Sequence, residues 1–456
     1  MRLRFLSLAL LAVPLLPPST LAAQQPVADQ YRTVANRIIA AALADSSVAW
    51  NRLAAFVDYS GPRLSGSANL ERGIDWMLAE MQKDGLANVR GEPVMVPHWV
   101  RGRESLTMTL PREADVPMLG LGGSIGTSAQ GITAEVLVVS SFEELTKRAA
   151  DAKGKMVLFD VPFTSYGETV RYRGAGAVAA ARAGAVASLI RAVGPYGMRT
   201  PHTGGMGYDS TVARVPAAAI PMEDAMMFHR MQDRDQKVVV TLKMDAQMLP
   251  DAPSRNAIGE LTGREKPREI VVLGGHIDSW DVGLGAMDDA GGVVVAWEAM
   301  KLLKRLGLTP RRTIRVVGWT NEENGGRGGA AYRDAHRDEP HALAIESDGG
   351  VFAPQGFGFS GSDSARAIIR QVGSLLERIG AGRIGASGGG ADIGPIMSTG
   401  VPGMGLDVDG SKYFWFHHTQ ADTPDKLNPA EMQRCVAAFA VMAYIIADLP
   451  ELLPRK

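Results

Sequence analysis

Histidine and carboxylate side chains that could bind a divalent metal ion follow two apolar, strand-like runs in the second half of the chain. The first run ends in His276 and Asp278, and the second ends in Glu322 and Glu323. Between them, an Asp-Asp pair begins at Asp288 and opens a Gly- and Ala-rich segment with helical character. Ligands of open α/β sheets collect at the carboxyl ends of the strands, so this β-α-β unit would bring imidazole and carboxylate groups to one edge.

Two later segments add side chains of the same kind. Asp348 follows the apolar run 342–345, and His417 and His418 end an aromatic run and are followed closely by Asp422. A single His-x-Asp is common by chance, and one acid of the Asp-Asp pair could serve only as a helix cap. Five separate loops that each offer a His or an acid after an apolar run favour a joint metal site over a set of solvated turns.

The composition of this set favours two metal ions. Two neutral imidazoles and three carboxylates would offset most of the charge of two divalent ions, and a bridging hydroxide would offset the rest. Ligands of mixed His and carboxylate type, without thiolates, suit zinc, with cobalt or manganese as substitutes. A spare carboxylate beside the ligands could then act as the general base.

The order of these residues resembles the co-catalytic zinc aminopeptidases and carboxypeptidases of peptidase family M28, over nearly the whole mature chain. The matching positions are His276-x-Asp278, Asp288-Asp289, Glu322-Glu323, Asp348 and His418-Thr-x-x-Asp422. The resemblance implies an α/β fold with a mixed central sheet sandwiched by helices, the zinc exopeptidase fold. It also implies an inserted protease-associated (PA-like) domain and a homodimer.

The resemblance assigns metal ligands residue by residue. His276 and Asp348 would bind one zinc ion, Glu323 and His418 would bind the second, and Asp288 would bridge the two. In the family, the peptide bond within the Asp-Asp pair is often cis.

The resemblance assigns supporting roles as well. Glu322 would be the general base, and the carboxylate of Asp278 would orient His276. His418 is preferred to His417 as a ligand because His418 precedes the Thr-x-x-Asp pattern, and the role of His417 stays open.

The length of the chain and its pattern of helix-like and strand-like segments indicate more than one part. The 456 residues exceed the size at which a single core usually stops growing. Helical periodicity predicts helices at 31–44, 48–57 and 70–84, whereas short β-like runs dominate the middle third. We expect a peptidase domain made of residues 23–104 and 251–456, interrupted by a PA-like insert at 105–250 that supplies no metal ligand.

The N-terminus and the overall charge indicate where the protein works. Arg2 and Arg4 precede an apolar stretch and then small residues, which predicts a signal peptide at 1–22. We therefore expect a secreted or periplasmic protein with no membrane attachment after cleavage.

A net charge of -1 without a basic run argues against a nucleic-acid partner. The single cysteine, Cys435, lies in an apolar helical segment and is expected to be a buried hydrophobe.

These observations predict an exported two-zinc metallopeptidase that hydrolyses small peptides, such as dipeptides with free termini. An aminopeptidase acting on longer peptides is an alternative, and a non-catalytic zinc protein is opposed by the intact Glu322. Gly385 to Gly389 formally match the serine-hydrolase elbow around Ser387, but no convincing strand precedes them. Many family members carry Ser-Asp-His where this chain has an Asp392 flanked by apolar residues, which leaves the role of Asp392 and the side-chain preference open.

Overall fold

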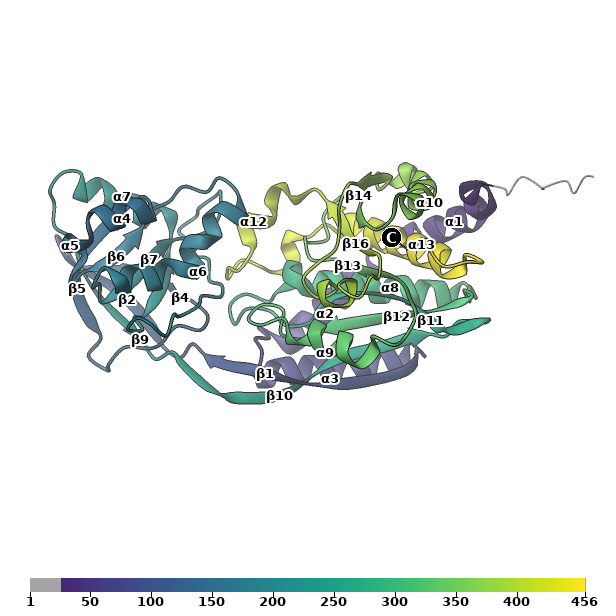
Figure 1. Ribbon diagram of the computed structural model, residues 1–456, viewed down its shortest axis with the longest axis horizontal. Coiled ribbons are helices and arrows are strands. Elements are labelled where there is room, and N and C mark those ends of the chain that lie inside the picture. Colours follow the sequence, from purple (N-terminus) through teal and green to yellow (C-terminus); the bar gives the residue numbers. More distant parts are fainter. Residues whose placement is uncertain (1–25, 456) are drawn as a thin grey trace, which may run out of the picture.

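The computed structural model describes residues 26–455 and shows two lobes, each built on an eight-stranded sheet (Figure 1). The predicted signal peptide at 1–22 lies outside the described residues. The sheet of the larger lobe has, in spatial order, β1 (Ala87–Val100), β10 (Gln247–Leu261), β12 (Arg312–Trp319), β11 (Lys266–His276), β13 (His341–Glu346), β16 (Gly403–Val408), β14 (Pro354–Ser360) and β15 (Arg383–Gly385).

Four adjacent strands in the middle of this sheet, β12, β11, β13 and β16, run parallel to one another. β12 and β13 are buried along their whole lengths, as expected for parallel strands covered on both faces. β10 and β14 flank the parallel group in antiparallel orientation, so the sheet is mixed. The carboxyl ends of the four parallel strands therefore meet at one edge, where the predicted metal ligands follow them.

Helices cover both faces of the larger sheet. Neighbouring residues of β11 point to opposite sides: Val271 and Leu273 join one core, and Ile270 and Val272 join the other. The first core is closed by α1 (Val27–Leu43), α2 (Val48–Ser60), α3 (Ala68–Lys83), α8 (Gly291–Arg305), α10 (Asp363–Ser374) and α13 (Pro429–Asp448). The second is closed by α9 (Arg327–His336) and α11 (Gly394–Met397). The predicted α/β class, with a mixed central sheet between helices, is confirmed.

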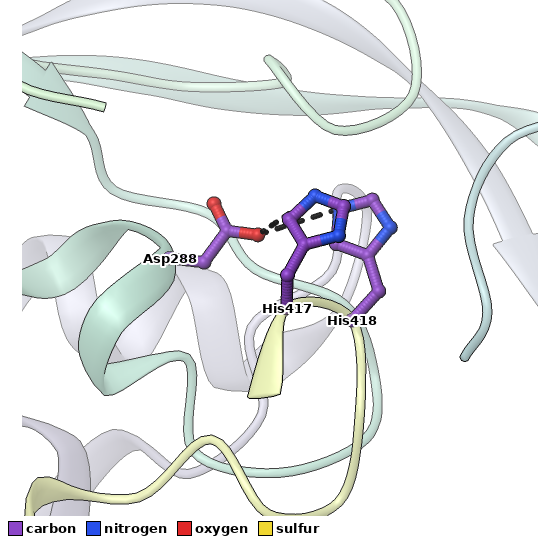
Figure 2. Close-up of side chains that lie close together, drawn as sticks. All are labelled: Asp288, His417 and His418. Atoms are coloured by element: carbon purple, nitrogen blue, oxygen red, sulfur yellow. Dashed lines mark ion pairs between the residues drawn. The ribbon is translucent and has the colours of Figure 1, made fainter. Parts of the chain in front are cut away.

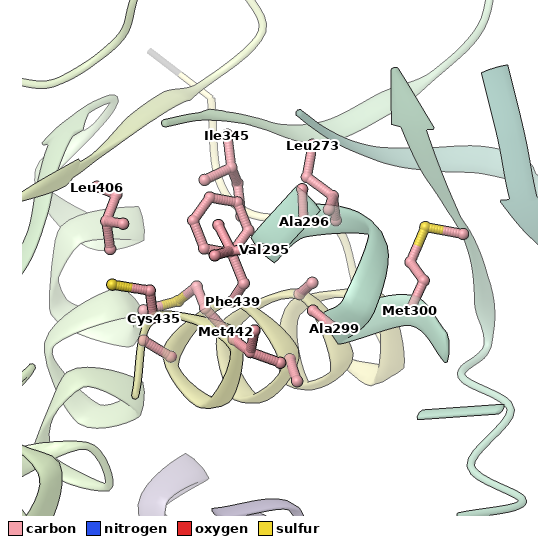
Figure 3. Packing of buried hydrophobic residues seen from close by; sticks show 14 of the residues in the cluster. Leu273, Val295, Ala296, Ala299, Met300, Ile345, Leu406, Cys435, Phe439 and Met442 are labelled. Atoms are coloured by element: carbon pink, nitrogen blue, oxygen red, sulfur yellow. The ribbon is translucent and has the colours of Figure 1, made fainter. Parts of the chain in front are cut away.

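The centre of the larger core is the contact of α13 with α8 and the sheet (Figure 3). Phe439 and Met442 of α13 pack beside Val295 and Ala299 of α8, and all four are buried. Within residues 26–455, α13 is the one helix whose length and composition would allow a membrane span. However, 83% of its apolar window is buried inside the fold, as in a core helix.

The smaller lobe is built from the middle of the chain. Its sheet has the spatial order β3 (Ala114–Val116), β2 (Glu104–Leu110), β9 (Val239–Met244), β5 (Ile132–Val139), β6 (Met156–Phe159), β7 (Ala187–Arg191), β8 (Ala217–Ile220) and β4 (Leu119–Gly120). Its helices are α4 (Phe142–Lys147), α5 (Ala149–Ala152), α6 (Tyr166–Arg182) and α7 (Met222–Gln232). The long antiparallel pair β1 and β10 connects the two lobes (Figure 1).

Candidate metal centre

His276 is the last residue of β11 and is fully buried. Its Nε2 lies 3.2 Å from Asp288 Oδ1 and 3.4 Å from Asp348 Oδ1. Burial opposes protonation of His276, but the two carboxylates raise its pKa well above the usual value. Its Nδ1–H donates to the main-chain carbonyl of Asp278 at 3.0 Å, which leaves the Nε2 lone pair available to a metal.

The hydrogen bond predicted for the Asp278 carboxylate is made by the main-chain carbonyl of the same residue instead. The carbonyl makes the direct hydrogen bond to His276, and the nearest carboxylate oxygen is 3.8 Å from Nδ1. The carboxylate instead accepts the N–H groups of Glu322 and Glu323, at 3.1 and 3.3 Å. Asp278 therefore fixes both the imidazole and the turn that carries the two glutamates.

Asp288 lies between His276 and His418. Its Oδ1 faces His276, and its Oδ2 lies 3.3 Å from His418 Nε2. Asp288 belongs to a π-helical turn, Ala286–Ala290, that precedes α8, and the Asp288-Asp289 peptide is cis, as the family resemblance implies. Asp289 takes the capping role considered for the pair, since its carboxylate accepts N–H groups from Gly292 of α8 and from His276.

The turn around Asp288 is held by Asp422. The Asp422 carboxylate accepts the N–H groups of Ala286, Met287 and Asp288 at 2.7–3.1 Å. Three such bonds fix the main chain that presents the Asp288 carboxylate. The Thr-x-x-Asp pattern that marks His418 thus supplies the support for Asp288.

Arg63 supports the same region from the loop between α2 and α3. It is fully buried and donates to the carbonyls of Gly61, Ile277, Leu284 and Gly285 at 2.7–3.0 Å. Sequence reasoning missed Arg63 because three of these partners lie more than 200 positions away. No local pattern distinguishes it from a surface arginine.

Glu322 and Glu323 lie in the turn 322–325, which two residues separate from the end of β12. Adjacent strand residues point to opposite faces, so both glutamates can face this cluster only because the chain turns here. Glu323 Oε2 lies 3.0 Å from His418 Nε2. Burial raises the pKa of Glu322 to about 8, and the negative charges of Asp348 and Glu323 add to this effect.

Two consecutive histidines follow α12 (Tyr413–Phe416) and point toward Asp288 (Figure 2). Their rings are stacked, with centroids 3.5 Å apart, and His418 adopts a left-handed φ of 59°. His418 contacts both Asp288 and Glu323, whereas His417 Nε2 lies 3.6 Å from Asp288 alone. Burial disfavours the charged form of His418, but Glu323 and Asp288 raise its pKa to about 9.

The main chain of the smaller lobe forms hydrogen bonds with His418. His418 Nδ1–H donates to the carbonyl of Thr203 at 3.2 Å, and the Thr203 N–H donates to the carbonyl of His418 at 3.0 Å. The first bond selects the tautomer whose Nε2 can bind a metal. Thr203 is a further residue that sequence reasoning did not find.

The geometry of the cluster suits metal binding. Three overlapping groups have ligand atoms within 4.8 Å of one another: Asp288 with His417 and His418, His276 with Asp289 and Asp348, and His276 with Asp288 and Glu323. His276 Nε2, Asp288 Oδ2 and Glu323 Oε1 are buried without a hydrogen-bond partner. Buried polar atoms normally have partners, so these three atoms fit metal-facing donors. Within residues 26–455, no smaller-lobe residue belongs to these groups.

Two residues left open by the sequence lie in the loop after β15. Asp392 is buried beside Glu346, whose carboxylate accepts the Ile393 N–H, and burial and Glu346 raise the Asp392 pKa well above its usual range. A short strand, β15, does precede Ser387, contrary to the sequence expectation, but Ser387 is exposed and the next helix, α11, begins only at Gly394. Ser387 therefore lacks the strand-turn-helix context of a nucleophile elbow.

Comparisons with known proteins agree with this geometry. The family model described as Peptidase family M28 matches residues 256–443. Carboxypeptidase Q from Xenopus laevis is 49% identical over 93% of this chain and 92% of its own length, and that from Homo sapiens is 48% identical over 89% and 87%. The crystal structure of a peptidase M28 precursor from Shewanella amazonensis is 35% identical with a TM-score of 0.90, and covers 94% of this chain and 99% of that chain. The chain therefore belongs to peptidase family M28 and is related over most of its length to the carboxypeptidase Q proteins.

Proposed function

We propose that this protein is an exported two-zinc metallopeptidase that hydrolyses small peptides, with dipeptides bearing free termini as the main substrates. One observation carries the proposal: the two oxygens of Asp288 face different histidines, His276 at 3.2 Å and His418 at 3.3 Å. A carboxylate in this position can bridge two metal ions. Each histidine has one further carboxylate beside it, Asp348 or Glu323, which completes a symmetrical ligand set.

Zinc bound there would polarise the scissile carbonyl and lower the pKa of a water molecule. Glu322 would take a proton from the attacking water and return it to the leaving amine. Asp278 holds the Glu322 main chain, and its carbonyl keeps the metal-binding tautomer of His276. The Asp348 side chain is 27% exposed while His276 is 1% exposed, so substrate would enter from the Asp348 side.

The specificity and the setting of this activity belong to the same proposal. The kinship with carboxypeptidase Q favours a carboxypeptidase or dipeptidase, and an aminopeptidase acting on longer peptides is the alternative. We also propose that the smaller lobe is a PA-like insert, that the signal peptide is removed on export, and that the chain forms a homodimer. Mass spectrometry of the secreted protein and light scattering test the last two points.

A hydrolysis profile tests the activity. Dipeptides, N-blocked dipeptides and longer peptides are incubated with the zinc-loaded protein, with and without a chelator. We expect dipeptide hydrolysis that the chelator abolishes and that both a serine-directed phosphonate and Ser387→Ala leave unchanged. Faster release of N-terminal residues from long peptides would favour the aminopeptidase. Activity that resists chelation but not the phosphonate would contradict a metallopeptidase.

A further inference from the structure

Arg101 is a buried cation at the point where the two lobes meet. It directly follows β1 and is 9% exposed. Its Nε–H and one Nη2–H donate to the two carboxylate oxygens of Asp281, at 2.8 and 2.6 Å. Such a two-point pair holds a guanidinium and a carboxylate in one geometry. Arg101 is thereby connected to the loop 277–285, which lies between the candidate metal ligands His276 and Asp288.

The remaining N–H groups of the same guanidinium surround Thr203. Arg101 Nη2 donates to the Thr203 hydroxyl at 3.2 Å, and that hydroxyl donates to the Gly120 carbonyl at 2.8 Å. Arg101 Nη1 donates to the same carbonyl and to Glu104. Thr203 in turn exchanges two main-chain hydrogen bonds with His418, one through the His418 ring and one through its carbonyl. Only Thr203 therefore stands between Arg101 and His418.

Trp280, the neighbour of Asp281, inserts into the core of the smaller lobe. It belongs to the loop 277–285, yet it is 2% exposed and packs in the apolar cluster that includes side chains of β2 and β9. Within residues 26–455 its Nε1–H has no acceptor, so packing alone sets its position. A Cβ atom at Gly122 would lie 2.0 Å from the ring, so glycine there makes room for it. The Trp280 and His418 rings are 5.6 Å apart.

The two candidate histidine ligands depend on the smaller lobe to different extents. His276 Nδ1–H donates to the Asp278 carbonyl, so its ring is oriented within the larger lobe. His418 Nδ1–H donates to the Thr203 carbonyl, so its ring is oriented by the smaller lobe. A disturbance at Arg101 should therefore affect the metal position beside His418 more than the one beside His276.

We propose that Arg101 is a positioning residue of the metal centre, which holds His418 through Thr203 and holds the loop 277–285 through Asp281. A buried ion pair contributes little net stability, because desolvation offsets the attraction, so the fixed geometry is the more important effect of this pair. The inference rests on the proposed two-zinc function. It gives the smaller lobe a part in metal binding although no ligand comes from that lobe.

Zinc titration of the chelated protein by calorimetry tests this role, at a temperature where each variant is folded. The wild-type protein should bind two ions. Arg101→Gln should bind one ion with wild-type affinity and the other about 10- to 100-fold more weakly, the usual effect of losing a partner behind a metal ligand. Dipeptide hydrolysis at limiting zinc should fall by a similar factor, and excess zinc should restore most of it.

Three further variants separate positioning from general stability. Arg101→Lys keeps the charge but loses the two-point pair, and should retain part of the affinity. Thr203→Val removes only the hydroxyl contact, and should weaken the same zinc position by a smaller factor even if Arg101→Gln folds poorly. Arg103 lies two positions after Arg101 with 96% of its side chain exposed, and Arg103→Gln should leave both affinities unchanged.

The possible outcomes distinguish this role from the proposed function. Wild-type affinity at both positions in Arg101→Gln and Thr203→Val would overturn the proposal, even with lowered melting temperatures, because the contacts would then serve stability alone. Equal weakening of both positions would also overturn it, since His418 would not be the residue affected. A wild-type protein that binds a single ion, or that binds two and cleaves no dipeptide, would refute the proposed function itself.

Discussion

Glu322 and Glu323 are adjacent, but their side chains are placed differently in the metal centre. Glu323 lies 3.0 Å from His418 and belongs to one of the three groups of possible metal ligands described above. Glu322 belongs to none of these three groups. We therefore predict that Glu322→Gln keeps its zinc and its fold but loses turnover on the order of 10²–10⁴-fold, the usual contribution of general acid-base assistance. Zinc analysis and steady-state kinetics of the purified variant check this.

The complementary substitution should behave differently. Glu323→Gln removes one proposed zinc ligand, so we expect weaker zinc binding at one site and a lower melting temperature, because metal binding to the native state contributes stability. Measuring both variants under the same conditions gives the comparison. Normal zinc content in Glu323→Gln together with zinc loss in Glu322→Gln would reverse the two roles.

His418 gives the metal-free protein a pH dependence with a definite sign. Its pKa is raised from 6.5 to about 9 by Glu323 and Asp288, against the effect of burial. The stability it contributes is fully present below pH 6.5 and is lost as the pH rises through 9. Zinc needs the Nε2 lone pair that the proton occupies, so the two compete.

We therefore predict that the increase in melting temperature caused by zinc grows between pH 6.5 and 9. Thermal melts of the zinc-loaded and chelator-treated protein at several pH values measure the difference. His229→Gln serves as a control, because His229 lies on α7 of the smaller lobe and belongs to none of the three groups of possible metal ligands. This variant should leave the trend unchanged. A zinc increment that is constant or falls over this range would contradict the account.

The loop between α2 and α3 acts on the metal centre through a single side chain. Arg63→Met would leave four carbonyls without their donor, two of them on the buried residues Ile277 and Gly285. We expect a loss of at least about 3 kcal/mol in the free energy of unfolding, since each unsatisfied group costs roughly 1–3 kcal/mol. Urea denaturation measures it. Arg72→Met, an exposed change on α3, should cost about 1 kcal/mol or less, and equal effects of the two variants would refute this role for Arg63.

The elements that position the site could largely be predicted from the sequence. Helices predicted at 31–44, 48–57 and 70–84 are α1 (27–43), α2 (48–60) and α3 (68–83), and the apolar run before His276 is β11. These elements follow hydrophobic periodicity, which a single chain displays directly. The meeting of several ligands at one sheet edge followed from the parallel strand arrangement that such runs favour.

The sequence contains no comparable signal for the two long strands β1 and β10. β1 and β10 are the longest strands of the larger sheet, yet each contains two prolines, which argue against a strand when read locally. They form a strand pair because they pair with each other across more than 140 positions. The contacts of Thr203 with His418 likewise depend on how the lobes meet, which no local pattern records.

At the scale of the whole molecule, the reactivity of the single cysteine on the buried helix α13 measures whether the larger core is intact. Cys435 lies on α13, is fully buried, and its Sγ–H donates to the Phe352 carbonyl. Burial also raises the pKa of this thiol, which makes the reactive thiolate scarce. We predict no reaction with a thiol reagent in the native state and one reactive thiol per chain after unfolding. Rapid labelling of the native protein would show that α13 is not the core helix described.

The two-metal centre is the central claim, and zinc stoichiometry tests it most directly. The chelated protein is titrated with zinc while bound metal and dipeptide hydrolysis are measured in the same samples. The bridging role proposed for Asp288 predicts that activity rises until about two ions are bound per chain, as in other two-metal sites. Full activity with a single tightly bound ion per chain would contradict it.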